Sequence, residues 1–259
     1  MTITIKLDGP ADVVANTPAL VHYIPTGRVV IHALSERRLI MSGAMDPDAR
    51  GYRSFCRAAS DNGATAIVAI YWDAPTTDAD QLTAAARCYG LAITDILKVD
   101  GGLWSSLICQ DESCHCGGIV EQPADGGLLA GGTIRAERDE LDLFPAVPES
   151  EAKLTACLTA ASLADNDTRD ALVVRAAKGE GSAVLGEMLD LCRDGAVGPN
   201  VLSVAAAAAY LSGDGGLANV ILEREADHYG RLTRLGELID GAAARAVNPA
   251  DFAQMLSAL

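Results

Sequence analysis

The apolar run from Ala64 to Trp72, with the sequence ATAIVAIYW, constrains the fold more than any other stretch of this chain. Its continuous apolar, β-branched character is typical of a strand that is buried on both faces of a sheet. A helix is predicted after it, because Leu82, Ala85 and Tyr89 recur at helical spacing. A second strand is predicted over Leu91–Val99. Strands joined by a helix pair in parallel through a right-handed crossover, so this region predicts parallel pairing.

Further strands complete an α/β half. Val29–Leu34 and Leu39–Met45 flank a polar turn and predict a β-hairpin. Leu103–Cys109 is expected to add an antiparallel edge strand, and Thr2–Lys6 alternates as an opening strand would. We therefore expect an α/β domain over residues 1–122, with a mixed, mostly parallel sheet of about six strands and helices on its faces.

The second half has helical periodicity. Residues 123–149 are rich in Gly, Pro and acidic side chains, and are expected to connect the first domain to a helical domain over residues 150–259. Within that domain, the segment AAAAYLSGDGGLANVILERE combines small residues, a glycine turn and an apolar second helix. This pattern is typical of one tetratricopeptide-type hairpin. A single unit predicts a helical hairpin and not a solenoid.

The balance of charge narrows the choice of partners. The chain has 35 acidic and 20 basic residues, a formal net charge of −15. Phosphate binding requires a basic surface, so duplex DNA or RNA is disfavoured, and so is an anionic membrane. The longest near-apolar run, Val201–Leu211, is about half the length that spans a bilayer. We expect a protein partner and no membrane association; the sequence leaves the oligomeric state open.

Cysteine usage and the N-terminus predict the compartment. The opening residues MTITIKLDGP lack the basic and apolar regions of a signal peptide. Four of the seven cysteines are scattered through helical patterns, unlike the framework of a secreted, disulfide-rich protein: Cys56, Cys88, Cys157 and Cys192. We therefore expect a cytoplasmic protein with reduced thiols.

The remaining cysteines form a cluster that suggests a metal site. Cys109, Cys114 and Cys116, together with His115, place four potential zinc ligands within eight residues. Zinc takes four thiolate or imidazole ligands in a tetrahedron. His115 would point away from the cysteines that flank it, so a complete site needs help from Cys56, Cys88, His32 or a water molecule. The alternatives to structural zinc are partly buried thiols that pack the loop, and a local disulfide.

A ligand site in the α/β half is a second hypothesis. Open α/β sheets bind ligands beyond the carboxyl ends of their strands, and Asp73 directly follows the central strand. Asp73, Trp104 and Ser105 could line such a crevice. Alternatively, Asp73 is the N-cap of the next helix. The chain has no glycine-rich phosphate loop after a strand, no G-x-S-x-G and no H-E-x-x-H, so we assign no catalytic residue.

Several stretches, taken in order, resemble a known family. They are GPADVV, AIVAIYWDAP, ILKVDGGLWSSLIC followed by C-x4-C-x-C, and AAAAAYLSGDGGLANVILERE. With them the chain resembles an uncharacterised family from actinobacteria and their phages, domain of unknown function four-one-nine-two. Members typically have two adjacent cysteines followed by proline where this chain has Cys114-His115-Cys116. The resemblance implies a cytosolic protein of actinobacterial or phage origin with a two-part architecture, and it implies no activity.

Two classes of function stay open. The first is a non-enzymatic protein-interaction or regulatory module in which the helical half binds a partner. The second is a sensor or enzyme for a small, uncharged or cationic metabolite in the α/β half. The lack of a recognisable catalytic constellation and the tetratricopeptide-like hairpin favour the first class.

Overall fold

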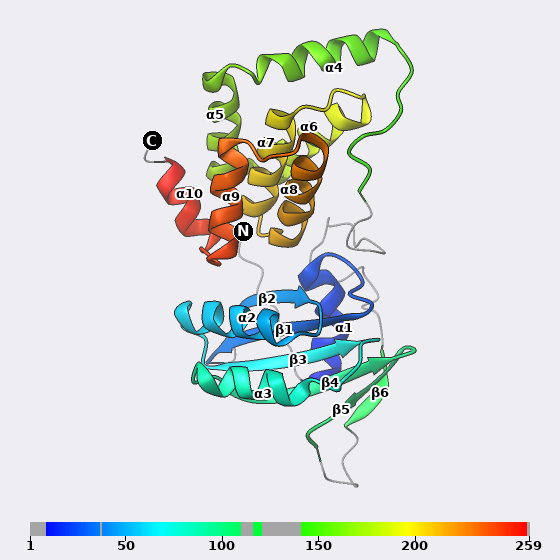
Figure 1. Ribbon diagram of the computed structural model, residues 1–259, viewed down its shortest axis with the longest axis vertical. Coiled ribbons are helices and arrows are strands. Elements are labelled where there is room, and N and C mark those ends of the chain that lie inside the picture. The colour runs from blue at the N-terminus through cyan, green and yellow to red at the C-terminus, as the bar shows by residue number, and fades with distance from the viewer. Residues whose placement is uncertain (1–8, 37, 110–115, 121–140, 258–259) are drawn as a thin grey trace. The chain divides into compact units, whose positions relative to one another are not determined.

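The chain forms two compact units, Met1–Arg138 and Asp139–Leu259. A computed structural model describes residues 9–36, 38–109, 116–120 and 141–257. The first unit is α/β and the second is helical (Figure 1). In the part of the chain described, no helix is both long and apolar enough to cross a membrane. The connection expected over 123–149 lies mostly outside the described residues, so the domain boundaries stay a prediction.

The α/β unit is built on one sheet whose described strands lie in the order β2-β1-β3-β4-β5-β6. Their bounds are β1 Arg28–Ser35, β2 Arg38–Met45, β3 Ala66–Trp72, β4 Ala92–Asp100, β5 Leu103–Ser106 and β6 Gly117–Ile119. The β1–β2 hairpin, and β3 and β4 joined by helix α3 (Ala79–Cys88), lie where the sequence predicts them. The opening strand expected over Thr2–Lys6 falls outside the described residues.

The sheet is mixed as expected, but the prediction that it is mostly parallel is wrong. Among the described strands, β3 and β4 pair in parallel, and every other neighbouring pair is antiparallel. The reason is the position of β1. Helix α2 (Ala49–Asp61) carries the chain from β2 to β3, so these two strands run in the same direction, as the crossover requires. β1 lies between them and is antiparallel to both.

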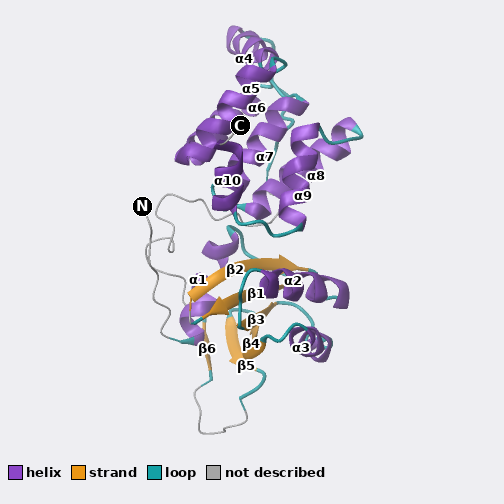
Figure 2. Cartoon of the chain, turned by 90° about the vertical axis from the view of Figure 1, so that its left-hand side faces the viewer, coloured by secondary structure: helices purple, strands orange, loops and turns teal. Residues whose placement is uncertain are grey.

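Helices cover both faces of β3, which explains its continuous apolar run. Figure 2 shows α1 (Pro10–Val21) on one face of the sheet and α2 and α3 on the other. The core under α2 and α3 contains Ile67, Ala69 and Tyr71. The core under α1 contains Val68, Ile70 and Trp72. Successive side chains of a strand point to opposite faces, so each core receives every second residue.

Strand β6 is a short edge strand that the sequence does not predict. It begins with two glycines, which carry no alternation of apolar and polar side chains. A Cβ atom on Gly118 would lie 3.1 Å from Nε1 of Trp104, and one on Gly117 would lie 3.0 Å from the Trp104 carbonyl oxygen. Glycine at both positions therefore allows β6 to pair closely with β5.

The helical unit packs around helix α7. Its helices are α4 Glu151–Ser162, α5 Asn166–Arg175, α6 Gly181–Arg193, α7 Pro199–Leu211, α8 Gly215–Tyr229, α9 Arg234–Ala244 and α10 Pro249–Ser257. A π-helical turn, Ala176–Glu180, joins α5 to α6 and bends at Gly179, whose φ of 99° glycine adopts without steric cost. Every residue from Val201 to Tyr210 is buried, so α7 is the central helix of this unit.

Alanine makes the close packing of α7 possible. Ala205–Ala209 are five consecutive alanines, each fully buried. The distance between packed helices depends on the side chains at the contact, so small residues allow neighbours to approach. α7 and α8 pack side by side as the helical hairpin that the sequence predicts. Its likeness to a tetratricopeptide unit stays a prediction.

Candidate functional site

Asp73, at the end of β3, is not the cap of the next helix. Helix α3 begins later, at Ala79, with Asp78 in the cap position. Asp73 has a φ of 48°, in the left-handed region that aspartate tolerates better than most residues. Its Oδ1 accepts a hydrogen bond from the Gly101 N–H at 3.0 Å. Asp73 therefore holds the turn between β4 and β5 against the end of β3.

The structure does not gather the three residues suggested as a ligand crevice. Trp104 is 8% exposed and packs with Val99 in the core under α1. Ser105 follows it along β5, points to the opposite face and is exposed. Asp73 thus contacts the β4–β5 turn, while Trp104 and Ser105 lie on opposite faces of the sheet.

Only part of the cysteine cluster lies within the described residues. Cys116 is disulfide-bonded, and Cys109 is a free, exposed thiol. The Sγ atoms of Cys109 and Cys116 are 3.2 Å apart. Among the residues that the structure describes, no three His, Cys, Asp or Glu side chains are grouped so that they could hold a metal ion. Cys114 and His115 fall outside those residues, so the structural-zinc hypothesis stays untested.

Elemental analysis tests the zinc prediction. We expect protein prepared under reducing conditions, without chelators, to contain substoichiometric zinc, because a fourth ligand cannot be identified. Cys109→Ser should then cost little stability, because the Cys109 thiol is exposed. About one equivalent of zinc, lost in Cys109→Ser together with thermal stability, would establish the structural site instead. Cys157→Ser and Cys192→Ser, in the helical unit, are the controls.

His32, on β1, is a buried histidine with both ring nitrogens hydrogen-bonded. Nε2 lies 2.9 Å from Oγ1 of Thr17, and Nδ1 lies 2.8 Å from Oγ of Ser42. The Thr17 hydroxyl donates its hydrogen to the Val13 carbonyl oxygen at 2.7 Å, so it accepts from Nε2–H. Nδ1 is then the acceptor of a hydrogen bond from Ser42. Neutral His32 thus links α1, β1 and β2.

Stability should depend on the protonation of His32. Desolvation by burial lowers the pKa of His32 from 6.5 to about 4. Between these two values the unfolded chain binds a proton that the folded chain does not, so stability is lost as the pH falls through this window. We predict that the free energy of unfolding decreases by about 2 kcal/mol between pH 6.5 and about pH 5.

Urea denaturation at several pH values measures this dependence. His32→Gln keeps a side chain that can donate and accept hydrogen bonds but does not titrate. Its free energy of unfolding should therefore be nearly flat across the same window. A slope in His32→Gln as steep as that of the wild type would assign the pH dependence to other groups.

A second buried polar cluster lies on the other face of the sheet. The hydroxyl of Tyr52, on α2, donates to Oδ2 of Asp78 at 2.5 Å and lies 3.5 Å from the hydroxyl of Tyr71. Asp78 is 8% exposed, and its Oδ1 has no hydrogen-bond partner among the described atoms. Burial and the Asp78 contact raise the pKa of Tyr52, and burial raises the pKa of Tyr71 to about 12. Both phenols stay protonated at neutral pH, and the cluster ties α2 to the start of α3.

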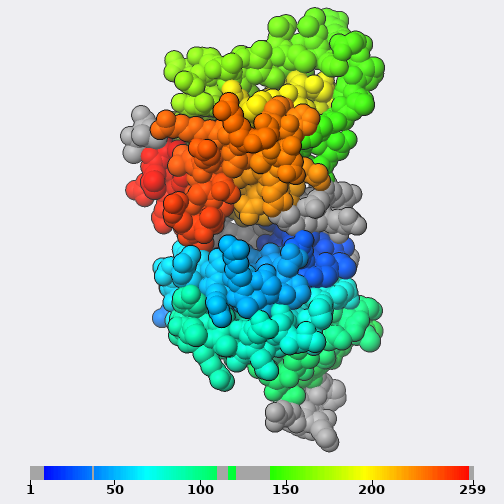
Figure 3. Space-filling view, in the orientation of Figure 1, coloured from blue at the N-terminus to red at the C-terminus, as the bar shows by residue number. Residues whose placement is uncertain are grey.

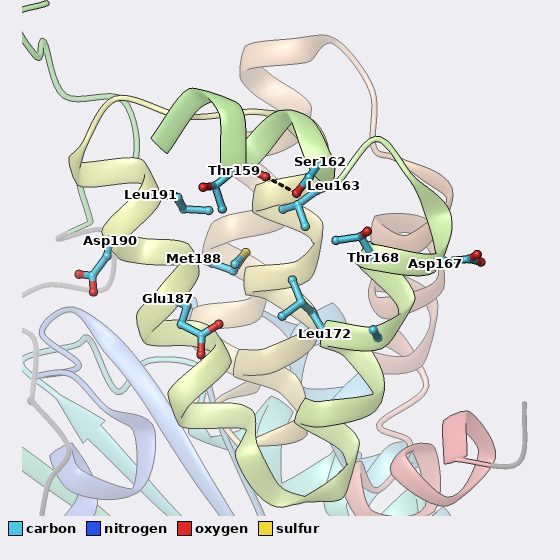
Figure 4. A pocket seen from close by; sticks show the side chains of 11 residues that line it. Thr159, Ser162, Leu163, Asp167, Thr168, Leu172, Glu187, Met188, Asp190 and Leu191 are labelled. Carbon is cyan, nitrogen blue, oxygen red and sulfur yellow. Dashed lines mark hydrogen bonds between the residues drawn. The ribbon is translucent and has the colours of Figure 1, made fainter. Parts of the chain in front are cut away.

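A pocket of about 820 Å³ lies in the helical unit, between α4, α5 and α6 (Figure 4). Pockets of roughly 300–1,000 Å³ are typical of ligand-binding sites. The apolar side chains that line it are Leu163, Ala171, Leu172, Met188 and Leu191. Three hydroxyl-bearing residues line it too: Thr159, Ser162 and Thr168. The pocket is therefore largely apolar, with a few polar groups.

Its charged lining is acidic. Asp167, Glu187 and Asp190 line the pocket, and none of the described lining residues is basic. Arg175 holds Glu187, with Nη1 and Nη2 at 3.1 and 3.0 Å from its carboxylate oxygens, and Arg193 pairs with Asp190. In the described part of the chain, the Asp167 side chain makes no hydrogen bond or ion pair. Figure 4 shows its carboxylate directed away from Leu172 and Met188, so Asp167 is open to an external cation at the rim of the pocket.

Comparison with known proteins identifies the family. Residues 10–155 match the family described as Domain of unknown function (DUF4192), and this match covers more than half of the 259 residues. The chain belongs to this family. The resemblance seen in the sequence is confirmed, while the actinobacterial or phage origin stays a prediction. No curated protein and no solved structure was found to match this DUF4192 chain.

The DUF4192 match ends inside helix α4, at residue 155. It contains the whole described sheet, whereas the pocket lining begins at Thr159. The pocket therefore lies beyond the matched region. Sequence reasoning missed it because its residues come from three helices and form no motif. The available signal was the mixture of apolar and acidic residues over 167–172 and 187–191.

Proposed function

We propose that this protein is a non-enzymatic protein-interaction module whose helical unit binds a partner protein. The observation that carries the proposal is the pocket between α4, α5 and α6, with its apolar lining and its acidic residues. Apolar surface that is open to water favours association, because a partner removes it from water. The binding function then lies in the second unit.

Helix α4 adds exposed apolar surface to the same unit. Leu154 is 62% exposed and Leu158 is 66% exposed, and they lie one turn apart on one side of the helix. Ala156 is the buried residue among those described in α4, so most of this helix faces solvent. In the space-filling view, α4 forms part of the outer surface of the helical unit (Figure 3). Apolar side chains grouped on a surface mark interaction sites.

We also propose a cytoplasmic location in an actinobacterium or in a cell infected by its phage. Cys56 and Cys192 are buried free thiols, which suits a reducing compartment, although Cys116 is disulfide-bonded. The family resemblance supports the origin. Neither point affects the choice of the binding surface.

The alternative is a sensor or enzyme for a small metabolite in the α/β unit. It would use the crevice residues Asp73, Trp104 and Ser105, two of which lie on opposite faces of the sheet. The described pocket lies in the other unit. These two observations favour the interaction module.

Site-specific photo-crosslinking tests the proposal in the lysate of the source organism. p-Benzoylphenylalanine replaces Ala171, which is exposed and lines the pocket, so that the benzophenone contacts whatever occupies it. We expect a discrete adduct with another protein. The same substitution at Ala244, exposed on α9, is the control. Absence of a protein adduct at Ala171, or the same adduct at both positions, would contradict the proposal.

A further inference from the structure

Two helices supply the long walls of the pocket. Its lining includes Asp167, Thr168, Ala171 and Leu172 from α5, and Glu187, Met188, Asp190 and Leu191 from α6. On each helix these positions recur at the spacing of a single face. Figure 4 shows Leu172 and Met188 pointing toward each other across the space between the helices, below the end of α4. A third helix packs its ridge of side chains into a space of this kind.

The dimensions of the lining fit the repeat of a helix. Each wall extends over about one and a half turns, or about 6–8 Å along its axis at 1.5 Å per residue. This is close to the spacing of side chains i and i+4 on an inserted helix. Met188 can adapt to such side chains, because its unbranched thioether changes shape easily. Leu172 and Leu191 are half-buried, so an occupant would bury them further.

The net charge of the helical unit favours a basic partner helix. From Asp139 to Leu259 the chain has 19 acidic and 9 basic residues, a formal net charge of −10. A field of this sign attracts cationic partners and speeds their encounter. Asp167 provides a contact at the rim of the pocket, where its carboxylate points outward, because Glu187 and Asp190 already pair with arginines of this chain.

We infer that the pocket binds one face of a basic amphipathic helix of a partner protein, with its apolar side chains between Leu172 and Met188 and a lysine or arginine against Asp167. This inference rests on the proposed function and specifies the partner's chemistry. It corresponds to helix-in-groove recognition, in which apolar anchors at i and i+4 enter a groove. The helical unit has no described strand, so its described surface offers no sheet edge to an extended peptide.

Isothermal titration calorimetry with designed peptides tests the inference on the full chain. The probe is a peptide of leucine and lysine in the helical period, about 14 residues long so that it can form a helix on binding. A counterpart has glutamate in place of every lysine. We expect saturable binding of one leucine–lysine peptide per chain and no binding of the glutamate peptide.

Two variants locate the binding site. Ala171→Trp fills the pocket from an exposed position and should weaken binding by roughly tenfold or more. Asp167→Asn removes the open carboxylate and should weaken binding by about threefold, as expected for an exposed ion pair. Ala244→Trp and Asp240→Asn, both at exposed positions on α9, make the same chemical changes and should bind like the wild type. Thermal melts of each variant are the check that it is folded.

Each contrary result overturns the inference in a different way. Binding that Ala171→Trp leaves unchanged, or that Asp240→Asn weakens as much as Asp167→Asn, would show general attraction to an acidic surface. Binding of octylamine at a site that Ala171→Trp blocks, without peptide binding, would assign the pocket to small cationic amphiphiles. A protein adduct from the Ala171 crosslinker whose captured segment is not a basic helix would overturn this inference and leave the proposed function standing.

Discussion

Val68→Asp should destabilise the α/β unit by about 4 kcal/mol, because it buries a carboxylate that has no partner. Val68 is 6% exposed and lies on the central strand, in the core under α1. His32 is its register partner on β1, but both ring nitrogens of His32 are already hydrogen-bonded. Its register partner on β4 is Asp95, whose carboxylate would repel a second one.

Tryptophan fluorescence during urea denaturation measures this effect separately from the helical unit. Both tryptophans of the chain, Trp72 and Trp104, lie in the α/β unit. Leu103→Asp, at a strand position that is 60% exposed, is the matched control and should change stability little. A Val68→Asp protein that unfolds at the wild-type urea concentration would mean that β3 is not the centre of the core.

Ala207→Leu should destabilise the helical unit by about 3 kcal/mol, although the new side chain is apolar. Ala207 is fully buried in α7, and the alanines on either side of it are fully buried as well. The added side chain would require neighbouring helices to move apart, because a packed interior has few voids. The loss of close packing then exceeds the gain from burying more apolar surface.

Far-UV circular dichroism follows this change, since most of the described helices belong to the second unit. We expect the melting temperature of the helical unit to fall by about 10 °C, with tryptophan fluorescence little affected. Ala244→Leu, at an exposed position on α9, is the control. Wild-type stability of Ala207→Leu would show that α7 is less closely packed than the burial of its alanines indicates.

Strand and helix identities could be predicted from the sequence because they depend on local patterns. The run over residues 64–72 could be recognised as a buried strand, and the paired segments around residues 35–38 as a hairpin. The order of the strands could not be predicted from the sequence, because it depends on which free edge of the sheet each strand joins. Nothing local in β1 shows that it pairs with β3 as well as with β2.

The candidate site was less predictable for a related reason. Trp104 and Ser105 are adjacent in sequence, and alternation along a strand sends them to opposite faces. Pocket residues such as Leu172 and Met188 are distant in sequence and meet through the packing of α5 and α6. Buried polar contacts, such as those of His32 with Thr17 and Ser42, likewise depend on tertiary structure. The chemistry of a single position therefore gave little information about its neighbours.

The strand order β2-β1-β3-β4-β5-β6 has a consequence for biosynthesis. Once the first hairpin exists, each later strand joins an edge that is still open: β3 beside β1, then β4, β5 and β6 in turn. No strand has to separate two that are already paired. Domains generally fold as units, from the N-terminus, while the ribosome is still translating. The sheet can therefore grow outward in one direction as the nascent chain emerges. All of its described strands can be paired before α7 has been synthesised.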